Sequence, residues 1–281
     1  MQQTVPSDTL IQRYDEGAVV LYADPRRVPL EGVRELFGLP DVLRALQGIS
    51  SRSKGRETVW RWAPAWFGAG RLVVRQFAHG GLLGPLWGTM FWSRRPMLRE
   101  LQIAMHALSR GVPTCRPIAL RLEKAAGFLF RAHYLTEEIP EARNLLELCR
   151  NKGGESRWPP VRRQRLAYTV ARVLASMHDA GICHGDLNLK NLLVAERDRE
   201  DLVYVIDLKK ARLKDRVSLR ERLRNLKRLD RSVVKWPESR RGITVFDRIR
   251  TLRAYLRLQP EAAENWKEVA RTMGVRRPER P

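Results

Sequence analysis

The stretch CHGDLNLKNLL, residues 183–193, places a His, an Asp and an Asn in one short segment. Asp and Asn in a loop usually cap or turn the backbone, and a single His is usually a packed core residue. Here, however, His184, Asp186 and Asn191 have the spacing H-x-D-x-x-x-x-N, and Asp207 ends the following apolar run VYVIDL. Four positions at fixed spacing favour a catalytic loop over an ordinary turn.

Phosphoryl transfer from ATP needs a carboxylate for the attacking hydroxyl, oxygen ligands for Mg²⁺ and a cation for the transferred group. The loop offers each of these parts. Asp186 is the candidate base, and Asn191 with Asp207 are candidate Mg²⁺ ligands. Lys190 is either a cation that reaches the phosphate or a solvated surface lysine. His184 is expected to be a structural member of the loop.

The N-terminal half offers accessory parts for nucleotide binding. The spacing H-x-D-x-x-x-x-N resembles the catalytic loop of kinases. A kinase-like fold also pairs a cation on the third strand with a Glu on the next helix, and Arg75 and Glu100 are the candidates for this pair. Arg at this position departs from the Lys that is usual in kinases. A guanidinium group keeps the positive charge but changes the reach and geometry of the side chain. Gly55 is the only candidate for a glycine-rich phosphate loop. Glu138, in EEIP, lies at the expected hinge, where backbone groups would contact adenine. The Phe-Gly pair that usually follows the corresponding Asp in protein kinases is missing after Asp207.

The order of elements predicts a two-lobed α+β fold. Residues 58–77 have the pattern of a β-hairpin, and the segment from 97 to 110 has the apolar spacing of a helix. We therefore expect an N-terminal lobe over residues 1–138, with an antiparallel sheet and one main helix. Its first 50 or so residues form an extension that matches no motif and carries a short helix. A larger, mostly helical C-terminal lobe is expected over residues 139–281.

The chain is strongly basic, with 53 Lys and Arg against 31 Asp and Glu in 281 residues and a net charge of +22. Such an excess favours anionic partners: nucleic acid, phosphorylated metabolites or an anionic membrane surface. Residues 209–257 alone contain 18 basic and 5 acidic residues. Apolar residues recur there at helical spacing, which places this charge on amphipathic helices with a basic C-terminal end. They are Leu219, Leu223, Leu226 and Val233.

Three scattered cysteines, Cys115, Cys149 and Cys183, predict reduced thiols rather than disulfides or a metal site. The N-terminal residues lack the apolar core of a secretory signal. The longest uncharged stretch, residues 76–93, contains several glycines and a proline, which disfavour a membrane-spanning helix. The expected location is therefore cytoplasmic, either soluble or peripheral on a membrane.

Taken together, the motifs resemble the bacterial lipopolysaccharide kinases and, more narrowly, the 3-deoxy-D-manno-octulosonic acid (Kdo) kinases. The resemblance covers about residues 52–215 and includes the helix with Glu100. Its other features are VVRQFAHGGLLG (73–84), GVPTCRPIA (111–119), YLTEEIP (134–140), HGDLNLKN (184–191) and VIDLKKA (205–211). The loop motif is typical of all kinase-like proteins, whereas HGGLLG and VPTCRPIA support the narrower family. Gly185, where protein kinases commonly have Arg, also favours a sugar acceptor over a protein.

The resemblance implies a two-lobed, protein-kinase-like fold and ATP-dependent phosphorylation of a Kdo hydroxyl in the lipid A–inner core region. It implies ATP and Mg²⁺ as cofactors and Kdo–lipid A, an anionic lipid-linked sugar, as acceptor. A basic protein would be attracted to the inner face of the bacterial inner membrane, where that acceptor lies. Residues 80–92 (GGLLGPLWGTMFW) are either an interfacial apolar loop or a segment packed in the core or over the active site.

Two other interpretations stay open. One is a small-molecule phosphotransferase of the aminoglycoside type, whose pockets are usually acidic and do not require such basic charge. The other is a nucleic-acid-binding or regulatory pseudokinase that uses the basic helices of residues 209–257. Retention of Asp186, Asn191 and Asp207 argues against a dead site, whereas Arg75 and the missing glycine loop argue for one. Nucleic acid is the less favoured partner, and the sequence does not predict the oligomeric state.

Overall fold

The computed structural model describes residues 11–46, 51–52, 58–78, 88–125, 127–150, 158–197, 200–237 and 239–274. The chain divides into two compact units. Unit 1 comprises Met1–Ser109 and Cys115–Glu138, and unit 2 comprises Arg110–Thr114 and Ile139–Pro281. Each unit has its own sheet and helices, so each is described by itself.

Unit 1 is built on a seven-stranded antiparallel sheet with the strand order β1-β2-β6-β7-β5-β4-β3. The strands are β1 (Gln12–Glu16), β2 (Val19–Ala23), β3 (Ser51–Arg52), β4 (Thr58–Trp62), β5 (Leu72–Gln76), β6 (Pro117–Lys124) and β7 (Phe130–Glu137). The hairpin predicted over residues 58–77 is confirmed as β4 and β5, and a short 3₁₀ helix, η2 (Ala65–Phe67), lies in its loop. The β1–β2 hairpin belongs to the same sheet, so part of the N-terminal extension is integral to the unit.

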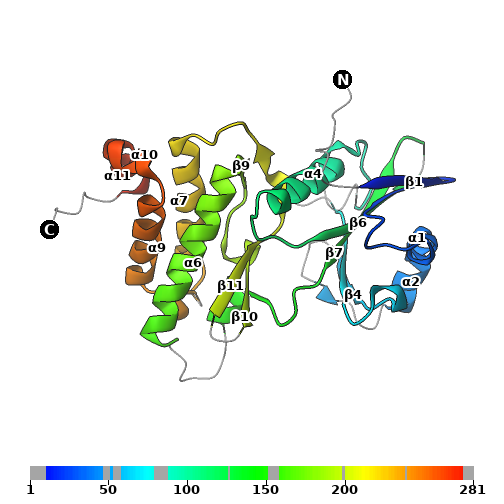
Figure 1. Ribbon diagram of the computed structural model, residues 1–281, viewed down its shortest axis with the longest axis horizontal. Helices are drawn as coiled ribbons and strands as arrows, with labels where there is room; N and C mark the ends of the chain where they lie inside the picture. The colour runs from blue at the N-terminus through cyan, green and yellow to red at the C-terminus, as the bar shows by residue number, and fades with distance from the viewer. Residues whose placement is uncertain are drawn as a thin grey trace. The chain divides into compact units, whose positions relative to one another are not determined.

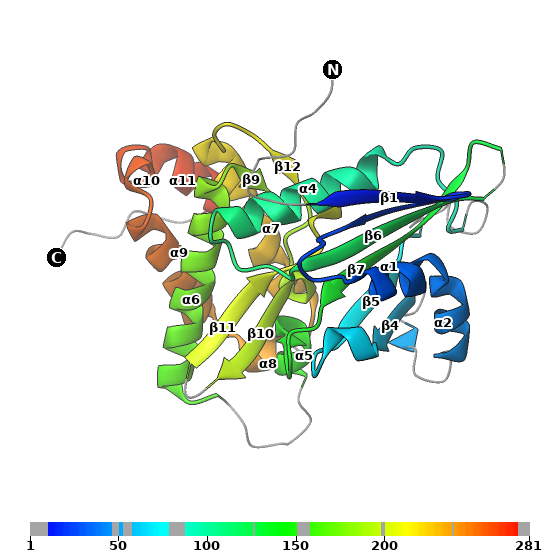
Figure 2. The same cartoon turned by 45° about the vertical axis from the view of Figure 1, so that its right-hand side comes forward.

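Helices cover both faces of this sheet (Figure 2). α1 (Leu30–Phe37) and α2 (Leu39–Ala45) pack on one face, in a core that includes Leu72 and Val74 of β5. α4 (Arg95–Ser109) packs on the other face, in a core that includes Phe77. Because successive side chains of a strand point to opposite faces, Arg75 lies on the α4 side of the sheet. The alternation of β5 thus places Arg75 within reach of α4.

Unit 2 is mostly helical, and α6 and α9 lie side by side within it (Figure 1). Its helices are α5 (Leu145–Cys149), α6 (Pro160–Asp179), α7 (Leu219–Lys235), α8 (Ser239–Gly242), α9 (Val245–Arg257), α10 (Pro260–Glu264) and α11 (Trp266–Met273). A three-stranded sheet has the order β11-β10-β8, and a two-stranded sheet pairs β12 with β9. These strands are β8 (Arg143–Asn144), β9 (Ile182–Cys183), β10 (Leu192–Arg197), β11 (Glu200–Val205) and β12 (Arg212–Leu213).

The helices of unit 2 have the amphipathic pattern expected from the sequence. In α7 the apolar positions Leu219, Leu223, Leu226 and Val233 are all buried, as predicted. Most of the basic residues between them are exposed, so the charge lies on the solvent face of a packed helix rather than in a tail. The three cysteines are free thiols, as predicted. Among the described residues, no helix combines the length and apolarity needed to cross a bilayer.

Candidate active site

The loop that begins at His184 connects β9 to β10 through a short 3₁₀ helix, η4 (Leu189–Asn191). His184 is fully buried, and its Nε2 lies 3.0 Å from the carbonyl oxygen of Ile206. Its Nδ1 accepts a hydrogen bond from the backbone N–H of Asp186 at 3.3 Å, so the proton resides on Nε2. Burial lowers the pKa of His184 below its ordinary value, which keeps the ring neutral. His184 therefore shapes the loop and does not act as a base.

Asp186 lies at the turn of this loop with its side chain 34% exposed. Its backbone carbonyl accepts hydrogen bonds from the side-chain amides of Asn188 at 2.8 Å and Asn191 at 2.9 Å. Lys210, in the 3₁₀ helix η5 (Leu208–Lys210), donates to Asp186 Oδ2 at 2.9 Å, and Arg228 of α7 lies 3.6 Å from Oδ1. Partial burial acts to raise the pKa of Asp186, but the Lys210 bond and the two positive charges outweigh it and hold that pKa below its ordinary value. The carboxylate is thus ionised at neutral pH.

The two candidate metal ligands lie on neighbouring segments. The backbone N–H of Ile206 donates to the carbonyl of Asn191 at 3.0 Å, and Asp207 follows directly in the left-handed conformation (φ 60°, ψ 62°). The side-chain amide nitrogen of Asn191 donates to the carbonyl of Asp186, which fixes the side chain. Its Oδ1 is an acceptor and is the atom that could bind a metal ion. An amide oxygen and a carboxylate are hard donors that suit Mg²⁺, which commonly takes the rest of its ligands from phosphates and water. In the described part of the chain, no cluster of three or more His, Cys, Asp or Glu forms a metal site.

Two cations beside Asp186 were missed by the sequence analysis, which singled out Lys190 instead. The Lys190 ammonium group lies 4.6 Å from the centre of the Trp236 ring. Its predicted role at the transferred phosphate stays a prediction. Lys210 follows Asp207 by three residues in VIDLKKA, so its short sequence distance from this candidate metal ligand was a usable signal. Arg228 gave no such signal, because it comes from a separate helix 42 residues after Asp186 in the chain.

Gly185 has a structural reason to be glycine. Its φ is +74°, and a Cβ atom at this position would lie 2.3 Å from the carbonyl oxygen of Lys210. The left-handed conformation and this close approach each exclude an ordinary side chain. They account for the glycine without reference to the acceptor, so the inference from Gly185 to a sugar substrate loses its force.

Gly185→Ala is expected to lower the free energy of unfolding by about 2–3 kcal/mol, because the new Cβ would have to displace the Lys210 backbone in addition to adopting an unfavourable φ. Gly111→Ala is a matched control, since Gly111 has a φ of +70° but no atom within 4 Å of its Cβ position. The control should lose about 1 kcal/mol. Urea unfolding measures both, and equal losses would show that the contact with Lys210 contributes nothing.

Helix α7 is fixed against the loop by side-chain hydrogen bonds. Asn225 Oδ1 accepts from the backbone N–H of His184 at 3.2 Å, and Ser232 Oγ accepts from that of Leu189 at 3.2 Å. Arg228 donates to the carbonyl of Gly185. Polar groups of α7 thus satisfy backbone groups of the loop at three successive points, which holds both elements in a defined register.

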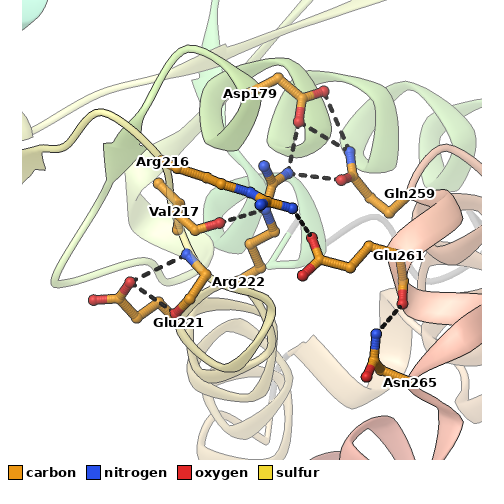
Figure 3. A network of polar contacts seen from close by, with 9 residues as sticks. Asp179, Arg216, Val217, Glu221, Arg222, Gln259, Glu261 and Asn265 are labelled. Atoms are coloured by element: carbon orange, nitrogen blue, oxygen red, sulfur yellow. Dashed lines mark hydrogen bonds and ion pairs between the residues drawn. The ribbon is translucent and has the colours of Figure 1, made fainter.

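A second network holds the first turn of α7 (Figure 3). Arg222, 7% exposed, donates to Asp179 at the end of α6 (2.6 Å), to the side chain of Gln259 (2.7 Å) and to the carbonyl of Val217 (2.9 Å). Gln259 in turn donates to Asp179. A guanidinium group with this many partners at fixed angles ties α7 to α6 and to the segment before α10. The network therefore supports the position of α7 beside the loop.

In unit 1, Arg75 and Glu100 form the ion pair that the sequence predicted. Arg75 Nη2 and Glu100 Oε1 are 2.5 Å apart, and Glu100 is 3% exposed. The Arg75 guanidinium also lies 4.8 Å from the centre of the Phe77 ring and 5.4 Å from that of Tyr134. Planar guanidinium groups stack well on aromatic rings, which an ammonium group does less effectively. These rings give a physical reason for Arg at this position.

Arg75→Met is expected to lower the free energy of unfolding by about 3 kcal/mol, because it removes a cationic partner from the buried Glu100 carboxylate. The double variant Arg75→Met/Glu100→Gln should recover part of this loss, since the amide carries no charge to bury. Urea unfolding of the wild type and the two variants provides the comparison. A double variant no more stable than Arg75→Met would contradict the explanation.

The remaining predicted nucleotide contacts are Glu138 and Gly55. The Glu138 carboxylate forms ion pairs with Arg61 at 2.7 Å and Arg71 at 2.9 Å, and its backbone N–H donates to the carbonyl of Arg71. Its role at adenine stays a prediction. Gly55 lies outside the described residues, as do residues 80–87 of the apolar segment. Of the rest of that segment, Phe91 is buried in the α4 core and Trp92 is 61% exposed, so both interpretations remain open.

Comparisons with known proteins agree with the sequence motifs. Residues 52–255 match the model of the lipopolysaccharide kinase (Kdo/WaaP) family. A 3-deoxy-D-manno-octulosonic acid kinase of Vibrio parahaemolyticus is 27% identical over 230 residues, which cover 80% of this chain and 89% of the relative. Kinases of the same name from Vibrio cholerae and Photobacterium profundum are 32% and 30% identical, over 58% and 66% of this chain and 65% and 74% of their own lengths.

The fold also has a counterpart among solved structures. A structure of WaaP in complex with acyl carrier protein matches with a TM-score of 0.56 and 22% identity, over 83% of this chain and 88% of that one. This similarity confirms the predicted kinase-like α+β fold. The family match spans the Arg75–Glu100 pair, the Asp186 loop and helix α7. The chain therefore belongs to the lipopolysaccharide kinase (Kdo/WaaP) family, as the motifs in its sequence indicated.

Proposed function

We propose that this chain transfers the γ-phosphoryl group of ATP to a hydroxyl of Kdo in the lipid A–inner core of lipopolysaccharide. The name shared by its curated relatives supports this acceptor. The observation that carries the proposal is Asp186, an ionised and partly exposed carboxylate bound through its backbone to Asn191. A base joined to a metal ligand in this way suits phosphoryl transfer.

Each side chain has a distinct part in the proposed reaction. Asp186 accepts a hydrogen bond from the acceptor hydroxyl, orients it and takes its proton as the new P–O bond forms. Asn191 Oδ1 and the Asp207 carboxylate would hold Mg²⁺, which neutralises charge on the phosphates when bound. Arg75, held by Glu100, would supply a cation to the phosphates of ATP. Gly55 and Glu138 remain candidate contacts for the nucleotide.

The charge of the chain supports a peripheral location on the inner face of the inner membrane. Among the described residues, no acidic side chain pairs with Arg220, Arg224, Lys227 or Arg231, and all four are exposed on α7. Clustered cations of this kind attract anionic lipid headgroups, by about 1 kcal/mol for each residue near the surface. Such an attraction would concentrate the enzyme at the surface that carries its lipid-linked acceptor.

The test of the proposed function is acceptor-dependent phosphate transfer. The purified protein receives radiolabelled ATP and Mg²⁺ with lipid A that carries one Kdo, or with the matched precursor that lacks Kdo. We expect label to enter the lipid only when Kdo is present. Label in both lipids would place the phosphorylated hydroxyl on lipid A itself, and label in neither would refute the proposal.

A further inference from the structure

The proposed base has two cationic neighbours that its chemistry does not explain. Lys210 Nζ lies 2.9 Å from one oxygen of Asp186, and Arg228 Nη1 lies 3.6 Å from the other. Both cations are well exposed, with side chains 67% and 47% accessible to solvent. They come from different segments, η5 and α7, so the fold brings them together at this carboxylate. Neither cation lies in the same turn or helix as Asp186, so the packing of separate segments places them there.

These cations offer little to stability or to basicity. Ion pairs this exposed usually contribute almost nothing to the free energy of folding. A positive charge beside a carboxylate also makes it a weaker base, whereas a general base works best with a pKa near the operating pH. Neither stability nor basicity therefore explains why Lys210 and Arg228 lie beside Asp186. Binding of an anionic group next to the base would explain it.

We propose that Arg228, together with Lys210, binds the carboxylate of the acceptor sugar acid and thereby places the acceptor hydroxyl at Asp186. This inference rests on the proposed function, since Kdo is a sugar acid and its carboxyl group is ionised at neutral pH. The base contacts the attacking hydroxyl, so the sugar that carries this hydroxyl lies within reach of both cations. An anionic group of that same sugar is a partner that fits cations at this place.

The geometry of Arg228 favours it as the principal contact. Its Nη1 donates to the carbonyl of Gly185, and Asn225 on the preceding turn of α7 binds the backbone of His184. The guanidinium group is thus fixed to the loop that carries the base. An arginine has five N–H donors in a rigid fork that matches a carboxylate, so one bond to Gly185 leaves others to bind the acceptor. Lys210 adds a second charge beside it.

The experiment compares two acceptors that differ only in this charge. Kdo–lipid A and its derivative with the Kdo carboxyl converted to a primary amide are presented in identical nonionic detergent micelles with ATP and Mg²⁺. We expect the wild type to favour the acid by roughly tenfold to a hundredfold in kcat/KM, mainly through KM, as for one charge-assisted contact. Arg228→Gln should lose activity toward the acid but little toward the amide, and Arg228→Lys should restore part of the preference.

Arg253→Gln is the matched control, because Arg253 is an exposed arginine on another helix of unit 2, α9, and has no assigned role in binding; it should keep the full preference for the acid. Equal loss toward both acceptors in Arg228→Gln would show that Arg228 only positions the loop, which overturns the inference. A wild type that phosphorylates both acceptors equally well would also overturn it while leaving the proposed function intact. Transfer to neither acceptor would refute the proposed function itself and the inference with it.

Discussion

Asp186→Asn is expected to reduce kcat for Kdo phosphorylation by about 10²- to 10⁴-fold, the usual contribution of a positioned general base. The amide has nearly the same shape as the carboxylate, and its oxygen can still accept the hydrogen bond from Lys210. It cannot take the proton of the acceptor hydroxyl. Since the backbone contacts of Asp186 to Asn188 and Asn191 do not involve its carboxylate, the loop should keep its conformation.

Binding measurements separate this role from a structural one. We expect Asp186→Asn to bind ATP with Mg²⁺ as the wild type does in isothermal titration calorimetry, and to show the same midpoint of urea unfolding. Asp215→Asn makes the same chemical change at an exposed carboxylate of unit 2 and should leave kcat unchanged. Loss of ATP binding in parallel with activity would argue against Asp186 as the base, because that pattern indicates a disturbed loop.

The fold was predictable where side chains repeat with a clear period. The β4–β5 hairpin and helices α4 and α7 have apolar positions at the spacing of a strand or a helix, and these elements were identified from the sequence alone. The β1–β2 hairpin was not, because β1 (QRYDE) is mostly exposed and has no apolar alternation. Its place in the sheet depends on pairing between β2 and β6, which lie about a hundred residues apart in the chain.

The candidate site divides in a similar way. Asp186, Asn191 and Asp207 were found because they have a fixed spacing in one continuous loop and strand. Arg228 was missed because only the packing of α7, through Asn225 and Ser232, brings it to the loop. Local patterns of residues therefore gave the residues proposed for the chemistry. The contacts proposed for the acceptor depend on tertiary structure, which a single sequence does not reveal.

Asp207→Asn addresses the alternative that the chain is an inactive pseudokinase. In the wild type, ATP at about a hundred times its dissociation constant should raise the free energy of unfolding by about 2.7 kcal/mol in the presence of Mg²⁺. We expect this Mg²⁺-dependent stabilisation to disappear in the variant, because the neutral amide loses the charge that would hold the ion. Phosphate transfer should fall by at least about 10²-fold, since charge on the phosphates is then poorly neutralised.

The choice of asparagine makes the result interpretable. Asp207 has a left-handed backbone, a conformation that Asn tolerates better than most other non-glycine residues. Alanine would add backbone strain to the loss of the charge, whereas Asn should leave stability without ligand close to that of the wild type. Thermal unfolding with ATP, with and without Mg²⁺, measures both quantities in one experiment.

A pseudokinase that binds nucleotide without metal would be stabilised equally under both conditions, and Asp207→Asn would then change nothing. A response to Mg²⁺ that depends on Asp207 would instead require a working metal site, which a regulatory or nucleic-acid-binding role has no reason to retain.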